Sequence, residues 1–311
     1  MITKVRIRRL ATIWGPATAV VATLALTGLT VTSGQSPYYS QQTLPRGQNV
    51  APSFEGWEEN ADGTFAMVFG YFNRNWEEQV DVPVGPGNMV EPGGPDRGQP
   101  AHFFPRRNKF VFRVPVPKDF GNKEVVWTLT SHGKTEKAYA TLKDDYKLDK
   151  RVLQTNTHMN LGVRNYPKFD EDMAENKPPT IKLEGEVGRT VKAGELLTLS
   201  AIVTDDGRLA RVAQQGSVDS DTTALGLRVA WLIYRGPSDK VAFTPEQFTV
   251  YQDKKVGGNS PWTPGWMPPP LPPDNKYPVK VRFGEPGTYV VRVLAADGGL
   301  DSAQDVTVIV K

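Results

Sequence analysis

The chain has 311 residues, and its 37 Lys and Arg against 34 Asp and Glu leave a formal net charge of only +3. A near-neutral chain lacks the basic footprint of nucleic-acid binding, so we expect no nucleic-acid partner. The absence of cysteine from the sequence excludes disulfides, thiolate metal sites, a cysteine nucleophile and a lipid-modified cysteine. We therefore expect stability to come from packing or from a bound ion.

The first 34 residues are typical of an export segment. A basic start, which contains Arg6, Arg8 and Arg9, is followed by a run without charge from residue 10 to residue 34. Two interpretations stay open: a signal peptide that is removed, or a single membrane anchor formed by residues 10–33. Both predict an exported protein, periplasmic or extracellular, that meets the membrane only through this segment.

After a polar leader or tether, residues 35–48, short alternating runs fill residues 49–142. Every second residue is apolar in each run, which is typical of strands. Turn sequences rich in Gly, Pro, Asn and Asp separate the runs, and no long helical period occurs. This part is predicted to be a first β-sandwich, with strands near residues 65–71, 80–84, 110–116, 125–130 and 138–142.

The pattern lapses in the polar residues 143–178, which we interpret as a linker between two domains. Alternation resumes at residue 179 and continues to residue 311. We predict that residues 179–311 form a second β-sandwich, enlarged by two insertions. The insertions are residues 207–224 and the proline-rich residues 259–278.

Four segments of the second half carry a resemblance: "NKPPTIKLEG", "VKAGELLTLSAIVTDDG", "LRVAWLIYRGP" and "FGEPGTYVVRVLAADGGLDSAQDVTVIV". In this order and spacing they resemble an immunoglobulin-like domain of the polycystic-kidney-disease (PKD) type, over residues 176–311. The resemblance implies an extracellular β-sandwich that serves as a spacer or binding module, and it implies no catalysis. The expected fold class is all-β, with two immunoglobulin-like β-sandwiches after the export segment.

The first half adds a second, broader resemblance. Together with "GWEENADGTFAMVFGYFNRN" and "DRGQPAHFFPRR", the segments above make the whole chain similar to a set of uncharacterised bacterial exported proteins. That resemblance implies a bacterial origin and an exported location, and it supplies no activity.

Three aromatic side chains are predicted to lie in the cores. Trp231 stands in the middle of a strand, where antibody domains bury a tryptophan, and Trp127 is assigned to the core of the first sandwich. Tyr289 follows the turn at Gly287, and we expect its ring to pack inward while its hydroxyl group caps the backbone at the corner.

Four aspartates form a candidate metal site: Asp205, Asp206, Asp297 and Asp301. In a sandwich, the end of the second strand and the turn before the last strand can share one pole, so their oxygens could converge on calcium. The spacing does not match a helix-loop-helix calcium site, and aspartate is also a good turn former. We expect no cofactor, with calcium as the weaker alternative.

The proline-rich insertion is the predicted contact surface. Trp262, Trp266, Met267 and Tyr277 belong to an extended run that a partner could bind, because rigid aromatic side chains are common interface anchors. The alternative is a long loop that folds back over its own sheet and buries both tryptophans.

No complete catalytic motif occurs in the sequence, so we expect no enzyme. The adjacent acids Glu77 and Glu78 follow the "NRN" turn of a predicted hairpin and begin its second strand. Neighbours in a strand point to opposite faces, so the two acids would not line one cleft. The histidines are too far apart for a zinc site and are interpreted as solvated loop residues: His102, His132 and His158.

Three functions from different classes remain, and the third would be an enzyme such as a glycoside hydrolase, which needs two carboxylates across an open cleft. The first is a non-catalytic scaffold or protein-binding module of the cell envelope, built from immunoglobulin-like domains. The second is a carbohydrate-binding module, which would need exposed, coplanar aromatic rings such as Trp57, Trp76, Trp262 or Trp266. The predicted partner is accordingly a protein or a glycan of the cell envelope.

Overall fold

The computed structural model describes residues 44–156, 171–209, 226–247 and 269–311. Residues 43–311 form one compact unit, and its main elements are strands. In the described part of the chain, no helix is long and apolar enough to cross a membrane. The export segment predicted for residues 1–34 and residues 259–268 of the proline-rich insertion lie outside the described residues.

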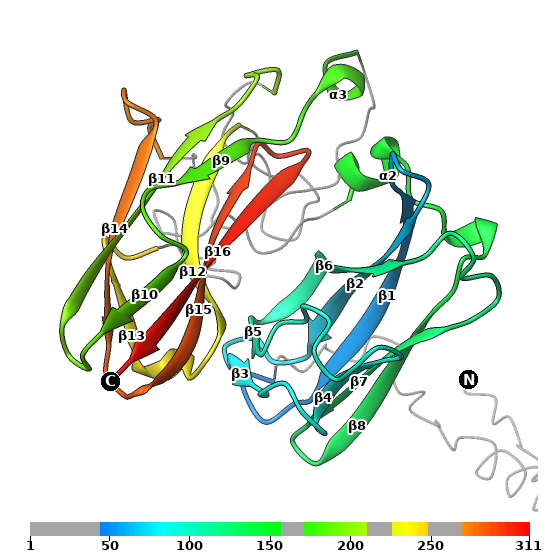
Figure 1. Ribbon diagram of the computed structural model, residues 1–311, viewed down its shortest axis with the longest axis horizontal. Coiled ribbons are helices and arrows are strands. Elements are labelled where there is room, and N and C mark those ends of the chain that lie inside the picture. Colours follow the sequence, from blue (N-terminus) through cyan, green and yellow to red (C-terminus); the bar gives the residue numbers. More distant parts are fainter. Residues whose placement is uncertain (1–43, 157–170, 210–225, 248–268) are drawn as a thin grey trace, which may run out of the picture. The chain divides into compact units, whose positions relative to one another are not determined.

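Two three-stranded sheets form the first sandwich, and each is antiparallel (Figure 1). One sheet has the order β1-β2-β6, with β1 at Val50–Glu59, β2 at Phe65–Asn73 and β6 at Arg106–Val116. The other has the order β4-β7-β8, with β4 at Asn88–Glu91, β7 at Val125–Ser131 and β8 at Lys134–Ala140. A short pair, β3 at Val80–Asp81 and β5 at His102–Phe103, completes this part.

The core of the first sandwich is aromatic. Phe69 of β2 stacks on Phe112 of β6, with ring centroids 5.3 Å apart, and both rings meet Trp127 of β7 edge-on. Trp127 is fully buried, and its indole N–H donates to Asn88 Oδ1 at 2.9 Å. The polar atom of this large ring is therefore satisfied inside the core, as buried tryptophan requires.

Strand β2 is covered on both faces, as its apolar sequence on both sides indicates. Its second face carries Val68, which packs with Phe110 of β6 and with Leu148. Leu148 belongs to a segment that includes the 3-10 turn η1 (Asp144–Tyr146) and helix α2 (Lys150–Gln154). This segment runs along β1: Leu148 N–H donates to the carbonyl of Trp57 at 2.8 Å.

The hairpin predicted around Glu77 and Glu78 is wrong. Strand β2 pairs with β1 and β6, while the next strand, β3, begins only at Val80 and pairs with β5. Glu77 and Glu78 lie in the intervening loop, where both backbone N–H groups donate to the carbonyl of Pro45. Strand pairing here is decided by contacts distant in sequence, which the local alternation does not contain.

The second sandwich consists of two four-stranded sheets (Figure 1). One has the order β13-β14-β11-β9, with β13 at Val241–Thr244, β14 at Lys276–Phe283, β11 at Leu196–Thr204 and β9 at Thr180–Leu183. The other has the order β10-β16-β15-β12, with β10 at Gly188–Val191, β16 at Asp301–Val310, β15 at Gly287–Ala296 and β12 at Arg228–Arg235.

This strand order is that of an immunoglobulin sandwich. Numbered within the domain, β9, β11, β14 and β13 occupy the places of strands A, B, E and D, and β12, β15 and β16 those of C, F and G. Strand β10 extends the second sheet by pairing in parallel with β16. The predicted all-β, immunoglobulin-like fold class is confirmed by this topology.

Trp231 and Tyr289 mark the core of the second sandwich. Both side chains are buried in one cluster with residues of all the long strands of this part. The indole N–H of Trp231 donates to the carbonyl of Tyr277 at 3.0 Å, and so joins the two sheets. The hydroxyl group of Tyr289 donates to the carbonyl of Glu285 at 2.9 Å, four residues upstream, which is the geometry of a tyrosine corner.

Candidate functional site

The outer face of strands β12 and β15, which points away from the core of the second sandwich, is mainly apolar and buried. Its small and apolar side chains belong to the same buried cluster as the core of the first sandwich: Ala230, Leu232, Tyr234, Leu294 and Ala296. The two sandwiches therefore share apolar contacts, and we call the surface where they meet the junction. Burial of this kind is the dominant favourable contribution to association.

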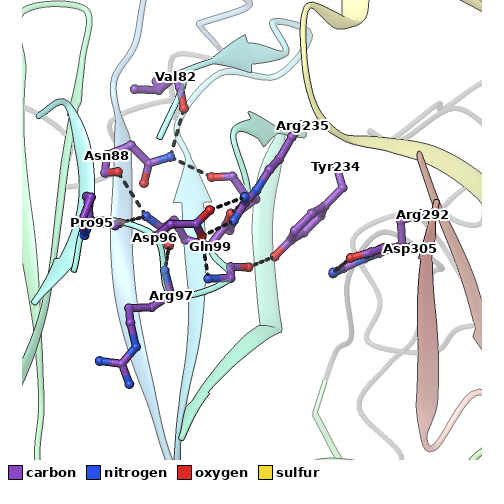
Figure 2. A network of polar contacts seen from close by, with 12 residues as sticks. Val82, Asn88, Pro95, Asp96, Arg97, Gln99, Tyr234, Arg235, Arg292 and Asp305 are labelled. Atoms are coloured by element: carbon purple, nitrogen blue, oxygen red, sulfur yellow. Dashed lines mark hydrogen bonds and ion pairs between the residues drawn. The ribbon is translucent and has the colours of Figure 1, made fainter. Parts of the chain in front are cut away.

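Polar contacts also cross the junction (Figure 2). Arg235, at the end of β12, donates to both oxygens of Asp96, with two N···O distances of 2.8 Å, and to the carbonyl of Gln99 at 2.9 Å. The hydroxyl group of Tyr234 donates to the carbonyl of Gly98 at 2.7 Å. The Arg235 hydrogen bond lowers the pKa of the Asp96 carboxyl group, which keeps the ion pair charged at neutral pH.

The loop that reaches Arg235, residues 92–101, is fixed from inside the first sandwich. The Asn88 side chain donates to the carbonyls of Val82 and Pro100, at 2.9 and 2.7 Å. The Gln99 side chain donates to the carbonyls of Asn88 and Pro95 (Figure 2). Asn88 and Gln99 are both completely buried, so the loop presents Asp96 on a rigid base.

A second basic side chain, Arg292, lies over the Tyr234 ring. The guanidinium carbon of Arg292 lies 3.4 Å from the ring centroid, and its nitrogens donate to both oxygens of Asp305 at 2.7 and 2.8 Å. The same guanidinium contacts the carbonyl of Val111 in the first sandwich at 3.4 Å. Tyr234 is thus held between the two sandwiches by a cation–π contact and a hydrogen bond.

His102 is buried, which corrects the expectation of a solvated loop histidine. Its Nδ1 lies 2.7 Å from Asp81 Oδ1, and its Nε2 lies 2.9 Å from Gln79 Oε1. The other oxygen of Asp81 accepts from the backbone N–H of Ser238 at 3.1 Å, in the second sandwich. His132 by contrast is half-exposed and lies 3.1 Å from Glu78, and His158 lies outside the described residues.

Of the four candidate metal ligands, the structure brings two together. Asp205 follows β11 and Asp297 follows β15, and their carboxylates are close enough to repel. Asp206 accepts from the backbone N–H of Arg208, two residues later, and from that of Lys177, 29 positions earlier, at 3.0 Å each. Asp301 starts β16 and faces Arg113: the Glu58 and Asp301 carboxylates outweigh burial and raise the Arg113 pKa.

The pair Asp205 and Asp297 has unusual electrostatics. Burial, together with the neighbouring carboxylates of Asp297 and Asp206, raises the pKa of Asp205 to about 6. Burial also raises the pKa of Asp297, against hydrogen bonds from Leu300, Gly299 and Asn176. No group of three or more Asp, Glu or His side chains in the described ranges is arranged to hold a metal ion.

Of the predicted contact residues, Tyr277 alone lies in the described part of the chain. Trp262, Trp266 and Met267 lie outside the described residues, and Tyr277 is half-buried on β14. Trp57 is buried, and its N–H donates to the carbonyl of Lys143. Trp76 is half-buried, and the Arg106 guanidinium lies over its ring, 4.1 Å from the centroid.

Two acids of the first sandwich, Glu58 and Glu78, have structural partners. Glu58 accepts from Arg113 through both oxygens, at 2.7 and 3.1 Å. Glu78 accepts from the backbone N–H of Gly47 at 2.6 Å and contacts His132. Each carboxylate thus stabilises a contact between segments distant in sequence.

Sequence reasoning missed the junction. The loop at residues 92–101 has the glycine and proline content of an ordinary turn, yet residues 99–105 are buried. A signal was present in β12, whose sequence "RVAWLIYR" is apolar on both faces. A strand with one solvated face alternates, so this continuous run indicates a cover on the second face.

No protein-family model matches the chain, and no curated protein matches its sequence. Among solved structures, it is similar to domains 4 and 5 of the S-layer protein SbsC, with a TM-score of 0.21 and 10% identity, covering 61% of this chain and 65% of that chain, just under two thirds. The titin domains Z1Z2 in complex with telethonin have a TM-score of 0.23 and 12% identity, with 84% and 96% covered. The D00-D0 domain of intimin has a TM-score of 0.22 and 11% identity, with 84% and 100% covered. TM-scores this low carry no argument about function.

Proposed function

We propose that this protein is a non-catalytic, exported scaffold or protein-binding module of the bacterial cell envelope, whose second sandwich is of the PKD type. The junction is the observation that carries the proposal. Tyr234, Arg235 and Arg292 join the sandwiches through hydrogen bonds, an ion pair and a cation–π contact. A unit joined in this way holds its two ends at a set distance, which is what a scaffold requires.

The chemistry of the described acids supports a role without catalysis. Glu58, Glu78 and Asp96 are each engaged with a basic side chain or backbone N–H group. A general acid or base needs a carboxylate directed at a substrate in an open cleft. These carboxylates are instead directed at their own protein.

The contact surface of this scaffold is the proline-rich insertion, residues 259–278. Rigid aromatic side chains such as Trp262 and Trp266 are efficient anchors for a protein partner. The carbohydrate-binding alternative would rest on the same two rings, because Trp57 is buried and Trp76 is half-buried, with the Arg106 guanidinium over its ring.

The test is affinity capture from the native envelope with the full chain and with a chain that lacks residues 259–268, a deletion that removes both tryptophans and leaves β14 intact. We expect a defined protein to be captured by the full chain and lost with the deletion. An unchanged set of captured proteins would contradict the contact surface. Sedimentation with purified envelope polysaccharide is the parallel measurement, and binding of polysaccharide by the full chain alone would favour the carbohydrate-binding function instead.

The export proposal has its own test. Cell fractionation should place the full chain in the envelope or the medium, and a chain lacking residues 1–34 in the cytoplasm. Recovery of the full chain in the cytoplasmic fraction would contradict an envelope function.

A further inference from the structure

Two buried oxygens near the ends of β11 and β15 have no hydrogen-bond partner: Oδ1 of Asp205 and Oδ1 of Asn176. Buried polar atoms in folded proteins are nearly always bonded, so such atoms require an explanation, for example an ion. Asn176 is 1% exposed, so its oxygen cannot be satisfied by bulk water.

The orientation of the Asn176 amide is fixed by its nitrogen. Nδ2 donates to Gln154 Oε1 at 3.0 Å and to Asp297 Oδ2 at 2.8 Å. Exchanging the nitrogen and the oxygen would set an oxygen against two acceptors. The side chain therefore reaches Asp297 with its nitrogen and leaves its oxygen free for a ligand.

Asp297 holds this arrangement together. Its side chain is completely buried, and Oδ1 accepts from the backbone N–H groups of Gly299 and Leu300 at 2.6 and 2.7 Å. On the other side, Asp206 accepts from the backbone N–H of Lys177 at 3.0 Å, so the residues that follow Asp205 and Asn176 in the chain are in contact. Three segments distant in sequence thus converge: the end of the linker, the end of β11 and the turn between β15 and β16.

The three segments are closely packed where they meet. A Cβ atom added at Gly299 would lie 2.7 Å from Gln154 Oε1 and 2.9 Å from Leu209 Cδ1. Gln154 closes α2, and its side-chain nitrogen bonds the carbonyl of Met173 in α3 (Glu171–Glu175). The turn that carries Asp297 is therefore seated directly on the linker.

The donor set consists only of oxygen: two carboxylates and one amide carbonyl. Such a set suits a hard cation, and calcium accepts six to eight oxygens in a flexible geometry that water can complete. One buried guanidinium, Arg228, faces Asp297, and the three carboxylates of Asp205, Asp206 and Asp297 outnumber it. We propose that Asp205, Asp297 and Asn176 bind one calcium ion.

The bound ion would have a structural consequence. Asn176 belongs to the chain that leaves the linker, while Asp205 and Asp297 belong to the second sandwich. Calcium would fasten the linker to the end of the second sandwich and so make the scaffold more rigid. The site goes beyond the scaffold function, since a scaffold needs no ion.

The test is calorimetric titration of the metal-free full chain with calcium chloride, with magnesium chloride as the comparison. We expect one calcium ion per chain. At a calcium concentration about a hundredfold above Kd, the melting temperature should rise by roughly 5 to 10 °C. Neither binding heat nor a shift in melting temperature at about 10 mM calcium, above the range of weak extracellular sites, would overturn the proposal.

Two matched variants locate the site. Asp205→Asn removes a buried charge and should fold, as circular dichroism would check, but should bind calcium at least tenfold more weakly. Asp301→Asn removes an acid that faces Arg113 and should bind calcium as the wild type does. Unchanged binding by Asp205→Asn, or an equal loss in Asp301→Asn, would show that calcium binds elsewhere and would overturn the assignment.

Discussion

The guanidinium group of Arg235 forms two hydrogen bonds of 2.8 Å with the carboxylate of Asp96, although the two residues are 139 positions apart in the sequence. The pair joins the end of β12 to a loop of the first sandwich. Bidentate pairs of this kind add geometric specificity to their electrostatic attraction. The contact therefore helps to fix the orientation of the two sandwiches and also contributes to stability.

A double-mutant cycle with Arg235→Met and Asp96→Asn should measure this contact. Asp96 is about half-exposed, so we expect a coupling free energy of about 1 kcal/mol, at the upper end for surface pairs. Arg235→Met alone should cost more, about 1 to 3 kcal/mol, because the hydrogen bond to Gln99 is also lost. Denaturant unfolding gives all four values.

The exposed pair Lys147 and Glu59 is the control for this cycle. Its two side chains are half-exposed and make a single 3.0 Å contact. We expect a coupling energy of about 0.3 kcal/mol or less. Equal coupling in the two cycles would contradict a special role of the Arg235 pair.

Truncating the apolar part of the junction should destabilise both sandwiches together. Leu232→Ala leaves a cavity in a cluster that both share, and we expect a loss of about 2 to 4 kcal/mol in the free energy of unfolding. Hydrogen exchange should report the same loss in β2 and β15. Leu196→Ala, at an exposed position, should change stability by less than about 0.5 kcal/mol. A loss confined to β15 would show that the sandwiches unfold independently.

Gly236→Ala should be strongly destabilising. Gly236 has a φ of +109°, and an added Cβ would lie 2.6 Å from Cδ1 of Tyr289, the corner tyrosine. Backbone strain and the clash together should cost about 3 kcal/mol, measured by denaturant unfolding. Gly194 also has a positive φ, +83°, but no atom lies within 4 Å of the added Cβ. Gly194→Ala should therefore lower the free energy of unfolding by only about 1 kcal/mol. Equal losses for the two variants would show that the clash with Tyr289 does not contribute.

The buried Glu55 predicts a pH dependence. Burial raises its pKa above the ordinary value of 4.5, and the opposing effect of Arg107, whose Nη2 lies 2.7 Å away, does not cancel it. A raised pKa in the folded state means that its contribution to stability is present below pH 4.5 and is lost as the pH rises through the folded pKa. The free energy of unfolding of Glu55→Gln should therefore improve relative to wild type over that window.

Urea unfolding between pH 4 and pH 8 measures this difference. Asp62→Asn is the control with the opposite sign, because hydrogen bonds from Thr64 lower the pKa of Asp62. Its stability relative to wild type should not improve as the pH rises. A pH-independent difference for Glu55→Gln would contradict the role of burial.

Many of the strands could be predicted because the alternation of apolar residues that marks a strand lies within a few consecutive residues. Alternating apolar residues located β2, β7, β11 and β15, and the buried positions of Phe69, Trp127 and Tyr289 followed from them. The partner of each strand could not be predicted in the same way. The pairing of β2 with β6 joins residues that are 33 to 51 positions apart, and the hairpin expected after β2 does not form.

The candidate sites divide along the same line. The order of strands predicts that Asp205 and Asp297 lie at the same end of the second sandwich, because each directly follows a strand of that sandwich. Asn176 lies in a polar run with no period, so nothing local connects it with Asp297, 121 positions later. The sequence also does not show that Asp301 faces Arg113 while Asp297, four positions earlier, lies near Asp205.

By itself, the sequence determined the class of fold, the core aromatics and the turn chemistry, since these follow from the period of the backbone and from local propensity. Only the tertiary structure decided that β12 turns a second apolar face toward the first sandwich, and that Arg235 meets Asp96. The physical reason is that such contacts depend on how whole sheets pack. Packing is a property of surfaces assembled from distant segments, and no window of the chain contains it.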